Sequence, residues 1–130
     1  KSKGITVIAG TGSNNTASTV KATEEAKALG VDAVLIVNPY YNKPSQAGLY
    51  RHIGEINKVG VPIVLYNIPG RTGITMSAET IAKCYRNYDQ VVAVKESTGS
   101  LDLASEIASL CDITILSGDD SLALPLISIG

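Results

Sequence analysis

Five short runs of β-branched and apolar residues, separated by segments with helical spacing, constrain the fold of this chain more than any other feature. None of the runs alternates cleanly between apolar and polar residues, which is typical of parallel strands covered on both faces. The runs are ITVIAG (5–10), VDAVLIVN (31–38), VPIVLYN (61–67), VVAVKE (91–96) and ITILSG (113–118). Their last residues are 28, 29, 29 and 22 positions apart, so the sequence predicts a strand–helix unit repeated without interruption.

The segments between these runs predict helices. In three of them, apolar residues at positions i, i+4 and i+7 form one continuous helix face. These sets are Ala22, Ala26 and Leu29; Leu49, Ile53 and Ile56; and Leu103, Ile107 and Leu110. Ser45 and Ser77 are suited to cap the second and third helices, and Gly30 is suited to end the first. A last helix is expected near the end of the chain, shortened or kinked by Pro125.

The repeated unit predicts an α/β fold with a parallel sheet. The chain of 130 residues has the length of one domain, and no internal boundary is expected. Two architectures remain open at this point: a five-stranded doubly wound sheet, and a part of a (β/α)8 barrel. Both bind ligands at the carboxyl ends of their strands, so chemistry is expected there in either case.

Composition argues against several classes of protein. The formal net charge is −1 and the Lys and Arg residues are scattered, so nucleic acid is not an expected partner. No apolar run has membrane-spanning length and no signal peptide is evident, so we expect no membrane and a soluble, cytoplasmic protein. Cys84 and Cys111 are interpreted as buried free thiols. His52, the single histidine, is expected on the surface of a helix, and no metal site is expected.

The residues best suited to chemistry follow the predicted strands. The five strand ends carry GTGSNNT (10–16), NPYYNKP (38–44), YNIPGRT (66–72), Lys95 and GDD (118–120). The first of these has the glycines of a phosphate loop, but it matches neither G-x-x-x-x-G-K-[ST] nor G-x-G-x-x-G. A tight turn whose Asn and Thr side chains cap the next helix is therefore the favoured interpretation.

Lys95 ends an apolar run, where an ammonium group is costly to bury. Glu96 is a poor partner for it, because adjacent residues of a strand point to opposite faces. Ala93 lies on the same face as Lys95, and its small side chain leaves room in a crowded interior. Two interpretations remain open: a lysine that reaches water or pairs with a carboxylate, and a desolvated amine that attacks a ketone to form an imine.

Further candidates surround this lysine. Tyr66 ends the neighbouring strand, where its phenol either shuttles protons for the Lys95 amine or is simply packed. Arg71 follows a Pro-Gly turn, where its guanidinium either grips a substrate carboxylate with two hydrogen bonds or is solvated. Tyr40 and Tyr41 are adjacent on a loop and cannot easily face one pocket together, so they predict an interface.

Taken in order, GTGSNNT, NPYYNKPSQAGLY, YNIPGRTG, VVAVKEST and LSGDD resemble the dihydrodipicolinate synthase family, also called the 4-hydroxy-tetrahydrodipicolinate synthases, of the N-acetylneuraminate lyase superfamily. The resemblance runs through nearly the whole chain. It implies a (β/α)8 TIM barrel, of which residues 1–130 would be a partial single domain covering roughly strands three to seven. Because the chain starts at Lys1 rather than Met, an excerpt of a longer protein is expected.

The resemblance also implies an activity and residue roles. The family condenses pyruvate with L-aspartate 4-semialdehyde through a lysine Schiff base, in the diaminopimelate pathway of lysine biosynthesis, and needs no cofactor. Lys95 matches the imine-forming lysine, Tyr66 a proton-relay tyrosine, and Arg71 the arginine that recognises the semialdehyde carboxylate. Tyr41 matches the relay tyrosine that each subunit lends to its neighbour's site across a tight dimer. The usual assembly of the family is a homotetramer, a dimer of such dimers.

A regulatory site is implied in the same way. Asn14 and Tyr40 match residues of the lysine-binding allosteric site that many members carry at the tight dimer interface. Ser18 stands where lysine-sensitive members often have a glutamate, and a serine cannot supply that carboxylate, which argues against strong inhibition by lysine. Two alternatives to the synthase remain: another pyruvate-dependent class I aldolase of the superfamily, and a non-catalytic homologue.

Overall fold

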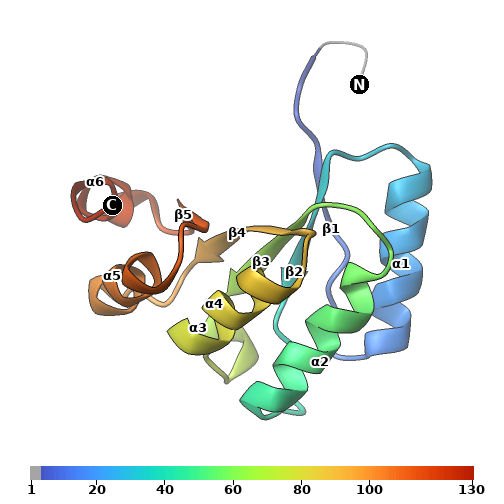
Figure 1. The fold of residues 1–130 in the computed structure, drawn as a ribbon, viewed down its shortest axis with the longest axis horizontal. Helices are drawn as coiled ribbons and strands as arrows, with labels where there is room; N and C mark the ends of the chain where they lie inside the picture. The colour runs from blue at the N-terminus through green and yellow to red at the C-terminus, as the bar shows by residue number, and fades with distance from the viewer. Residues whose placement is uncertain (1–3) are drawn as a thin grey trace.

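The computed structural model describes residues 4–130 and shows parallel strands alternating with helices (Figure 1). The strands are β1 (Ile8–Gly10), β2 (Ala33–Val37), β3 (Ile63–Asn67), β4 (Val91–Glu96) and β5 (Thr114–Ser117). The longer helices are α1 (Thr16–Ala28), α2 (Gln46–Asn57), α4 (Ala78–Asn87) and α5 (Leu101–Leu110). The short ones are α3 (Pro69–Thr72), the 3-10 turn η1 (Asp120–Leu122) and α6 (Ala123–Ser128). All five predicted strands are confirmed, each inside its predicted run.

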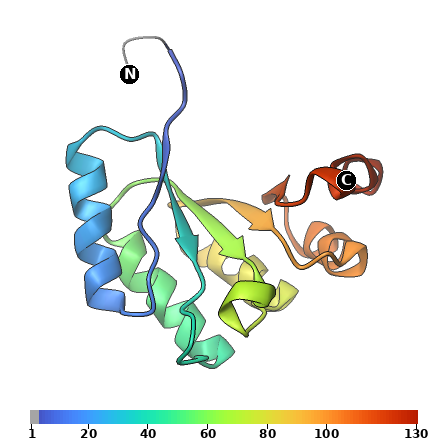
Figure 2. The same ribbon diagram turned by 180° about the vertical axis from the view of Figure 1, so that it is seen from behind.

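The strands lie in the order β1-β2-β3-β4-β5, and every neighbouring pair is parallel. A doubly wound sheet needs a point at which the strand order reverses, and no reversal occurs in the described part of the chain. Figure 1 and Figure 2 show α1, α2, α4 and α5 following one another along one side of the curved sheet. Sequential parallel strands with helices on one side form the wall of a (β/α)8 barrel, so the structure is an arc of a barrel.

Alternate residues of the strands face two different environments. The main core joins the helices to one face of the sheet, and its strand residues include Val34, Ile36, Ile63, Leu65 and Val94. Burial of each such side chain contributes about 1.5–3 kcal/mol, so this layer holds the arc together. A smaller cluster on the opposite, inner face contains Ala33, Val64 and Ala93. Tyr66 and Lys95 lie two residues beyond Val64 and Ala93, so they continue this inner face toward the carboxyl edge.

Side-chain caps fix where the long helices begin. The side chain of the residue before each helix accepts a hydrogen bond from a backbone N–H of its first turn; these residues are Asn15, Ser45, Ser77 and Ser100. The predicted caps Ser45 and Ser77 are therefore confirmed. In GTGSNNT the asparagine cap is confirmed at Asn15, but Thr16 is the first residue of α1 and its hydroxyl contacts His52 Nδ1 instead of capping the helix. Gly30 follows α1 with φ 78°, a left-handed conformation in which glycine ends a helix at little cost.

The predicted buried face of α1 is wrong at Leu29. Its side chain is 85% exposed, and the buried residues of α1 are Thr19, Thr23 and Ala26. Leu29 is the C-cap residue of α1, directly before the left-handed turn at Gly30. The apolar spacing therefore extends the buried face one residue too far along the chain.

The expectation that His52 lies on the surface is also wrong. Its side chain is only 5% exposed, on the buried face of α2. Its Nδ1 lies 2.8 Å from the Thr16 hydroxyl oxygen. His52 is three residues after Leu49 and four before Ile56, which is the spacing of one helix face. The apolar pattern therefore does indicate that His52 is buried.

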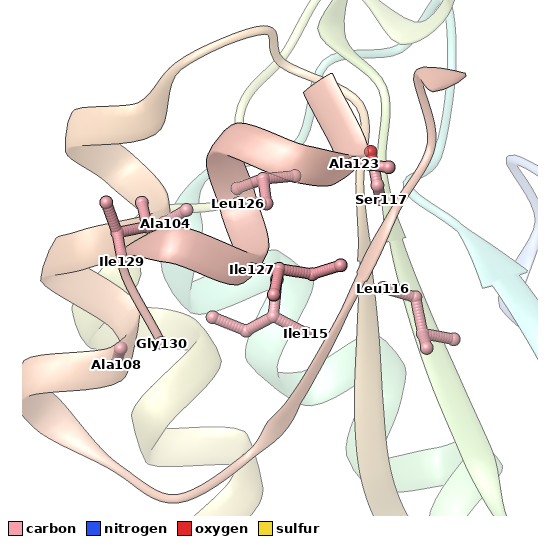
Figure 3. Close-up of a pocket in the computed structure, with 10 residues that line it drawn as sticks. All are labelled: Ala104, Ala108, Ile115, Leu116, Ser117, Ala123, Leu126, Ile127, Ile129 and Gly130. Atoms are coloured by element: carbon pink, nitrogen blue, oxygen red, sulfur yellow. The ribbon is translucent and has the colours of Figure 1, made fainter. Parts of the chain in front are cut away.

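The end of the described chain is apolar. α6 has six residues and contains Pro125, as the prediction of a shortened helix requires. A pocket lies between α5, β5 and α6 (Figure 3). Its lining residues are Ala104, Ala108, Ile115, Leu116, Ser117, Ala123, Leu126, Ile127, Ile129 and Gly130. None of these side chains titrates, so acid–base chemistry has to be sought elsewhere.

Both cysteines are free thiols, Cys84 buried and Cys111 only half-buried. Burial raises the pKa of the Cys84 thiol to about 12, which leaves it uncharged and unreactive. Among residues 4–130, no helix is long and apolar enough to cross a membrane. The same residues contain no group of three His, Cys, Asp or Glu side chains that could hold a metal ion.

Candidate active site

Lys95 and Tyr66 are paired residues on the neighbouring strands β4 and β3. The Lys95 Nζ lies 4.3 Å from the centroid of the Tyr66 ring, which is a cation–π contact. Both residues are half-buried, and within residues 4–130 no carboxylate lies at ion-pair distance from the amine. The geometry therefore gives an amine that is partly shielded from water, unpaired with any acid, and next to a phenol.

Glu96 points to the other face of the sheet, as strand alternation predicts, and does not pair with Lys95. Its side chain is 4% exposed, and its carboxylate accepts hydrogen bonds from the Thr98 N–H at 3.0 Å and the Asn67 Nδ2 at 3.4 Å. Burial raises the pKa of Glu96, although these hydrogen bonds favour the charged form. A buried carboxyl thus lies directly behind the candidate site.

Asn38 and Asn67 are two buried polar residues that the sequence analysis does not single out as functional candidates. Both are buried, and Asn38 Nδ2 donates to Asn67 Oδ1 at 3.2 Å. A signal was available, because Asn38, Asn67 and Glu96 each come at the end of an apolar run, on successive strands. Polar residues repeated at one level of neighbouring strands are expected to meet and to satisfy one another.

Arg71 lies on α3, a single helical turn that ends at Gly73 with φ 74°. The Thr72 hydroxyl donates to the Ile74 carbonyl at 2.9 Å, and this hydrogen bond stabilises the turn. The Arg71 side chain is exposed, and within the described chain it has no hydrogen bond or ion pair. Lys43 lies over the same turn, since a Cβ at position 73 would come within 2.9 Å of its Cε. The turn therefore presents a free guanidinium, with a second cation above it.

Tyr41 lies on the loop after β2 and is 91% exposed. Its φ of 72° is unusual for a bulky residue, and such backbone strain is concentrated at functional sites. The structure does not bring Tyr41 into contact with Tyr66 or Lys95 of the same chain. Its exposed position agrees with the prediction of an interface for this loop.

Asn14 and Tyr40, the two candidates for an allosteric site, are neighbours. Asn14 Nδ2 donates to the Tyr40 carbonyl at 3.2 Å, and Asn42 Nδ2 donates to the Asn14 carbonyl at 2.9 Å. These bonds join the loops that follow β1 and β2. Ser18 is exposed on the first turn of α1, and its side chain carries no charge.

Comparison with known proteins gives consistent results. The profile of the Dihydrodipicolinate synthetase family matches residues 2–130. The 4-hydroxy-tetrahydrodipicolinate synthase of Methanococcus maripaludis is 51% identical over 127 residues, which cover 97% of this chain and 44% of that relative. The structure of DHDPS from Cyanidioschyzon merolae with lysine bound is 46% identical, with a TM-score of 0.93, over 95% of this chain and 43% of the other.

A third relative has pyruvate bound. The chloride-inhibited dihydrodipicolinate synthase from Acinetobacter baumannii complexed with pyruvate is 41% identical, with a TM-score of 0.93. The match covers 99% of this chain and 45% of the other. The chain thus spans less than half the length of each of these three relatives.

Proposed function

The chain belongs to the Dihydrodipicolinate synthetase family, and we propose that the whole protein is a lyase that condenses pyruvate with L-aspartate 4-semialdehyde to 4-hydroxy-tetrahydrodipicolinate. This reaction belongs to diaminopimelate and lysine biosynthesis, a cytoplasmic pathway. The observation that carries the proposal is the contact of the half-buried Lys95 amine with the Tyr66 ring. The relative complexed with pyruvate supports the choice of the first substrate.

Lys95 supplies the nucleophile. Its neutral amine attacks the keto carbon of pyruvate, forms a carbinolamine and loses water to give an imine. The imine draws electrons from the neighbouring methyl carbon, which loses a proton to give an enamine. The enamine carbon then forms the new C–C bond to the aldehyde of the second substrate, whose oxygen takes up a proton and becomes the hydroxyl group. The amino group of that substrate then attacks the imine carbon, which closes the ring and releases the Lys95 amine.

Tyr66 moves protons in these steps. Carbinolamine formation and loss of water both need a proton at the former keto oxygen. The centroid of the Tyr66 ring lies 4.3 Å from the Lys95 Nζ, which supports proton transfer between the phenol and that oxygen, directly or through one water.

Arg71 binds the carboxylate of aspartate 4-semialdehyde. Its exposed guanidinium stands on a closed turn directly after β3, the strand that carries Tyr66. A planar guanidinium holds a carboxylate with two parallel hydrogen bonds, which orients the aldehyde as well as binding it.

Tyr41 acts in the site of a second subunit, within a homotetramer built as a dimer of tight dimers. The support for this assignment is its exposure of 91% and its positive φ, which place a strained aromatic residue at the tip of a loop. An aromatic side chain in such a position is suited to insert into a partner.

Asn14 and Tyr40 form part of a lysine-binding regulatory site at the same interface. The hydrogen bond between them and the lysine bound to the Cyanidioschyzon merolae relative support this assignment. Ser18 lacks the charge that would pair with the ammonium group of lysine, so we expect weak inhibition.

Trapping of the imine tests the proposal. The intact protein is incubated with pyruvate and reduced with borohydride, and the modified peptide is mapped by mass spectrometry. A pyruvyl adduct on Lys95 is the expected result, and Lys83, exposed on α4 above the Tyr50 ring, serves as the internal control that stays unmodified. Folded protein without an adduct on Lys95 would rule out every function that depends on the imine.

One alternative shares this imine. Another pyruvate-dependent class I aldolase would give the same adduct but would not need Arg71 for an aspartate semialdehyde carboxylate. Turnover with the semialdehyde separates the two functions. A non-catalytic homologue would give no adduct, and it has no need of the Lys95–Tyr66 contact.

A further inference from the structure

A buried polar network lies behind Lys95 and Tyr66, on the helix side of the sheet. Asn38, Asn67 and Glu96 form it, with 3%, 1% and 4% of their surfaces exposed. They come from the ends of three successive strands, and Asn67 and Glu96 are paired residues on β3 and β4. We call these three residues the strand-end clamp.

Asn67 is the centre of the clamp. Its Oδ1 accepts hydrogen bonds from Met76 N at 3.0 Å and from Asn38 Nδ2 at 3.2 Å. Its Nδ2 donates to the Met76 carbonyl at 3.0 Å and to the Glu96 carboxylate at 3.4 Å. Both lone pairs and both protons of the amide are therefore used, and its orientation is fixed by four groups.

These bonds connect the elements that carry the proposed chemistry. Asn67 directly follows Tyr66, and Glu96 directly follows Lys95, so the clamp fixes the backbone next to both residues. Met76 lies at the end of the segment that leads away from Arg71 and α3. One amide thus joins the ends of β2, β3 and β4 to the loop that presents the substrate-binding arginine.

A purely structural role does not require this polar arrangement. The clamp is buried, and buried polar groups are stable only when they are fully hydrogen-bonded. Apolar side chains of similar size would fill the same space without that demand. Apolar side chains pack without directional bonds. The Asn67 amide forms four hydrogen bonds, each of which fixes the direction of a neighbouring group.

We propose that Asn67 is the positioning residue of the site: it holds Tyr66 and Lys95 in register, so that the phenol and the amine reach the same substrate atoms. This inference rests on the proposed function. The effect is expected on imine formation itself, since a reacting group displaced by about 1 Å can lose up to about a hundredfold in rate. Asn67 does not touch the substrate and takes no proton.

The test compares two variants, each of which removes a side-chain contact at one end of β4. Asn67→Ala removes the contact with Glu96 at the carboxyl end, and Asn57→Ala, its matched control, removes the contact with Gln90 at the amino end. Asn57 Oδ1 accepts a hydrogen bond from Gln90 N at 3.0 Å, immediately before β4. Both changes remove one asparagine amide that is bonded to the main chain, and Asn57 has no place in the proposed chemistry.

The intact protein and both variants are mixed with saturating pyruvate, and the imine is trapped with borohydride at successive times. We expect the first-order rate of imine formation to fall by about tenfold for Asn67→Ala and to stay within about twofold for Asn57→Ala. The pyruvate concentration for half-saturation should change little. Thermal unfolding is measured for both variants, so that an effect on rate is not confused with loss of folded protein.

The outcomes separate this inference from the function on which it rests. No adduct in the unmodified protein would overturn the proposed function. An adduct that forms equally fast in the unmodified protein and in folded Asn67→Ala would overturn the positioning role alone. If Asn67→Ala does not fold, Asn38→Ala and Glu96→Ala each remove one hydrogen-bond partner of Asn67 from the clamp. A trapping rate lowered more than about twofold in either supports the inference, and unchanged rates in both overturn it.

Discussion

The Thr16 hydroxyl lies 2.8 Å from His52 Nδ1, so one hydrogen bond joins the first turn of α1 to the buried face of α2. Burial lowers the pKa of His52, because the charged imidazolium is poorly solvated there. His52 Nε2 is buried without a hydrogen-bond partner among the described residues. The fold therefore favours the neutral form of this histidine.

This preference predicts a loss of stability in acid. As the pH falls below 6.5, the unfolded chain binds a proton at His52 that the folded chain does not bind. The free energy of unfolding should therefore decrease from pH 6.5 down through the lowered pKa of the folded state. His52→Asn keeps a group that can bond Thr16 but does not titrate, so this part of the pH dependence should disappear. Chemical denaturation between about pH 5 and pH 8 measures it, and equal slopes for both proteins would contradict the prediction.

Ser97 and Gly118 are packed too tightly for two side chains. A Cβ at position 118 would lie 2.8 Å from Ser97 Cβ and 3.1 Å from the Glu96 carbonyl, and the Ser97 hydroxyl would overlap it. Gly118→Ala is therefore expected to lower the free energy of unfolding by about 1–3 kcal/mol. The Ser97 hydroxyl is buried without a partner in the described chain, so Ser97→Ala should be neutral or stabilise by up to about 1 kcal/mol.

Combining these two changes gives a sharper test. Ser97→Ala removes the overlapping hydroxyl but leaves its Cβ, so the double variant should recover part of the stability lost in Gly118→Ala. Urea denaturation of the four proteins gives the coupling energy, expected at about 0.5–3 kcal/mol for residues in contact. Strictly additive effects would show that the two positions do not contact one another.

Arg71→Lys should affect the two proposed substrates differently. Lysine keeps the positive charge but cannot form two parallel hydrogen bonds to a carboxylate. We expect kcat/KM for aspartate 4-semialdehyde to fall by about ten- to a hundredfold, while the rate of pyruvate imine formation stays unchanged. Arg51→Lys, an exposed change on α2, is the matched control. A loss in imine formation equal to the loss in turnover would assign Arg71 a different role.

The strands and the central pair could be predicted because they follow from local rules. Uninterrupted apolar runs gave the strands, and strand alternation placed Lys95 with Ala93 and opposite Glu96. The parallel repeat alone did not distinguish a barrel from a doubly wound sheet, since both contain the same units. The strand order in space decides that question.

Other features depend on contacts that no local pattern contains. The burial of His52 follows from helix spacing, but no residue near it in the sequence indicates its partner Thr16, which lies 36 residues away. Asn67 is bonded to groups on three other segments; the ends of the apolar runs indicate Asn38 and Glu96 as its neighbours, but not Met76. Tyr41 is exposed in this chain, and the contact proposed for it is with a second subunit, which no pattern within one chain can indicate.

That proposed contact can be tested by mixing two inactive proteins. Tyr41→Phe removes the phenol that one subunit lends, and Lys95→Ala removes the nucleophile of the site that receives it. In a mixed dimer, the intact Lys95 belongs to the Tyr41→Phe subunit and receives Tyr41 from the Lys95→Ala subunit. Random exchange of equal amounts makes half of the dimers mixed, each with one complete site of two, so we expect about a quarter of the wild-type activity.

Each variant alone should stay nearly inactive in this experiment. Subunits are exchanged in dilute urea and returned to native buffer, and turnover is compared with that of each variant treated in the same way. Mixtures of Tyr41→Phe with Tyr66→Phe provide a second pairing, expected to recover activity for the same reason. If Tyr41 served the Lys95 of its own chain, every mixed dimer would lack a complete site and no mixture would gain activity, whatever the subunit ratio. The exposure of Tyr41 favours recovery, because it leaves the phenol accessible to a second subunit.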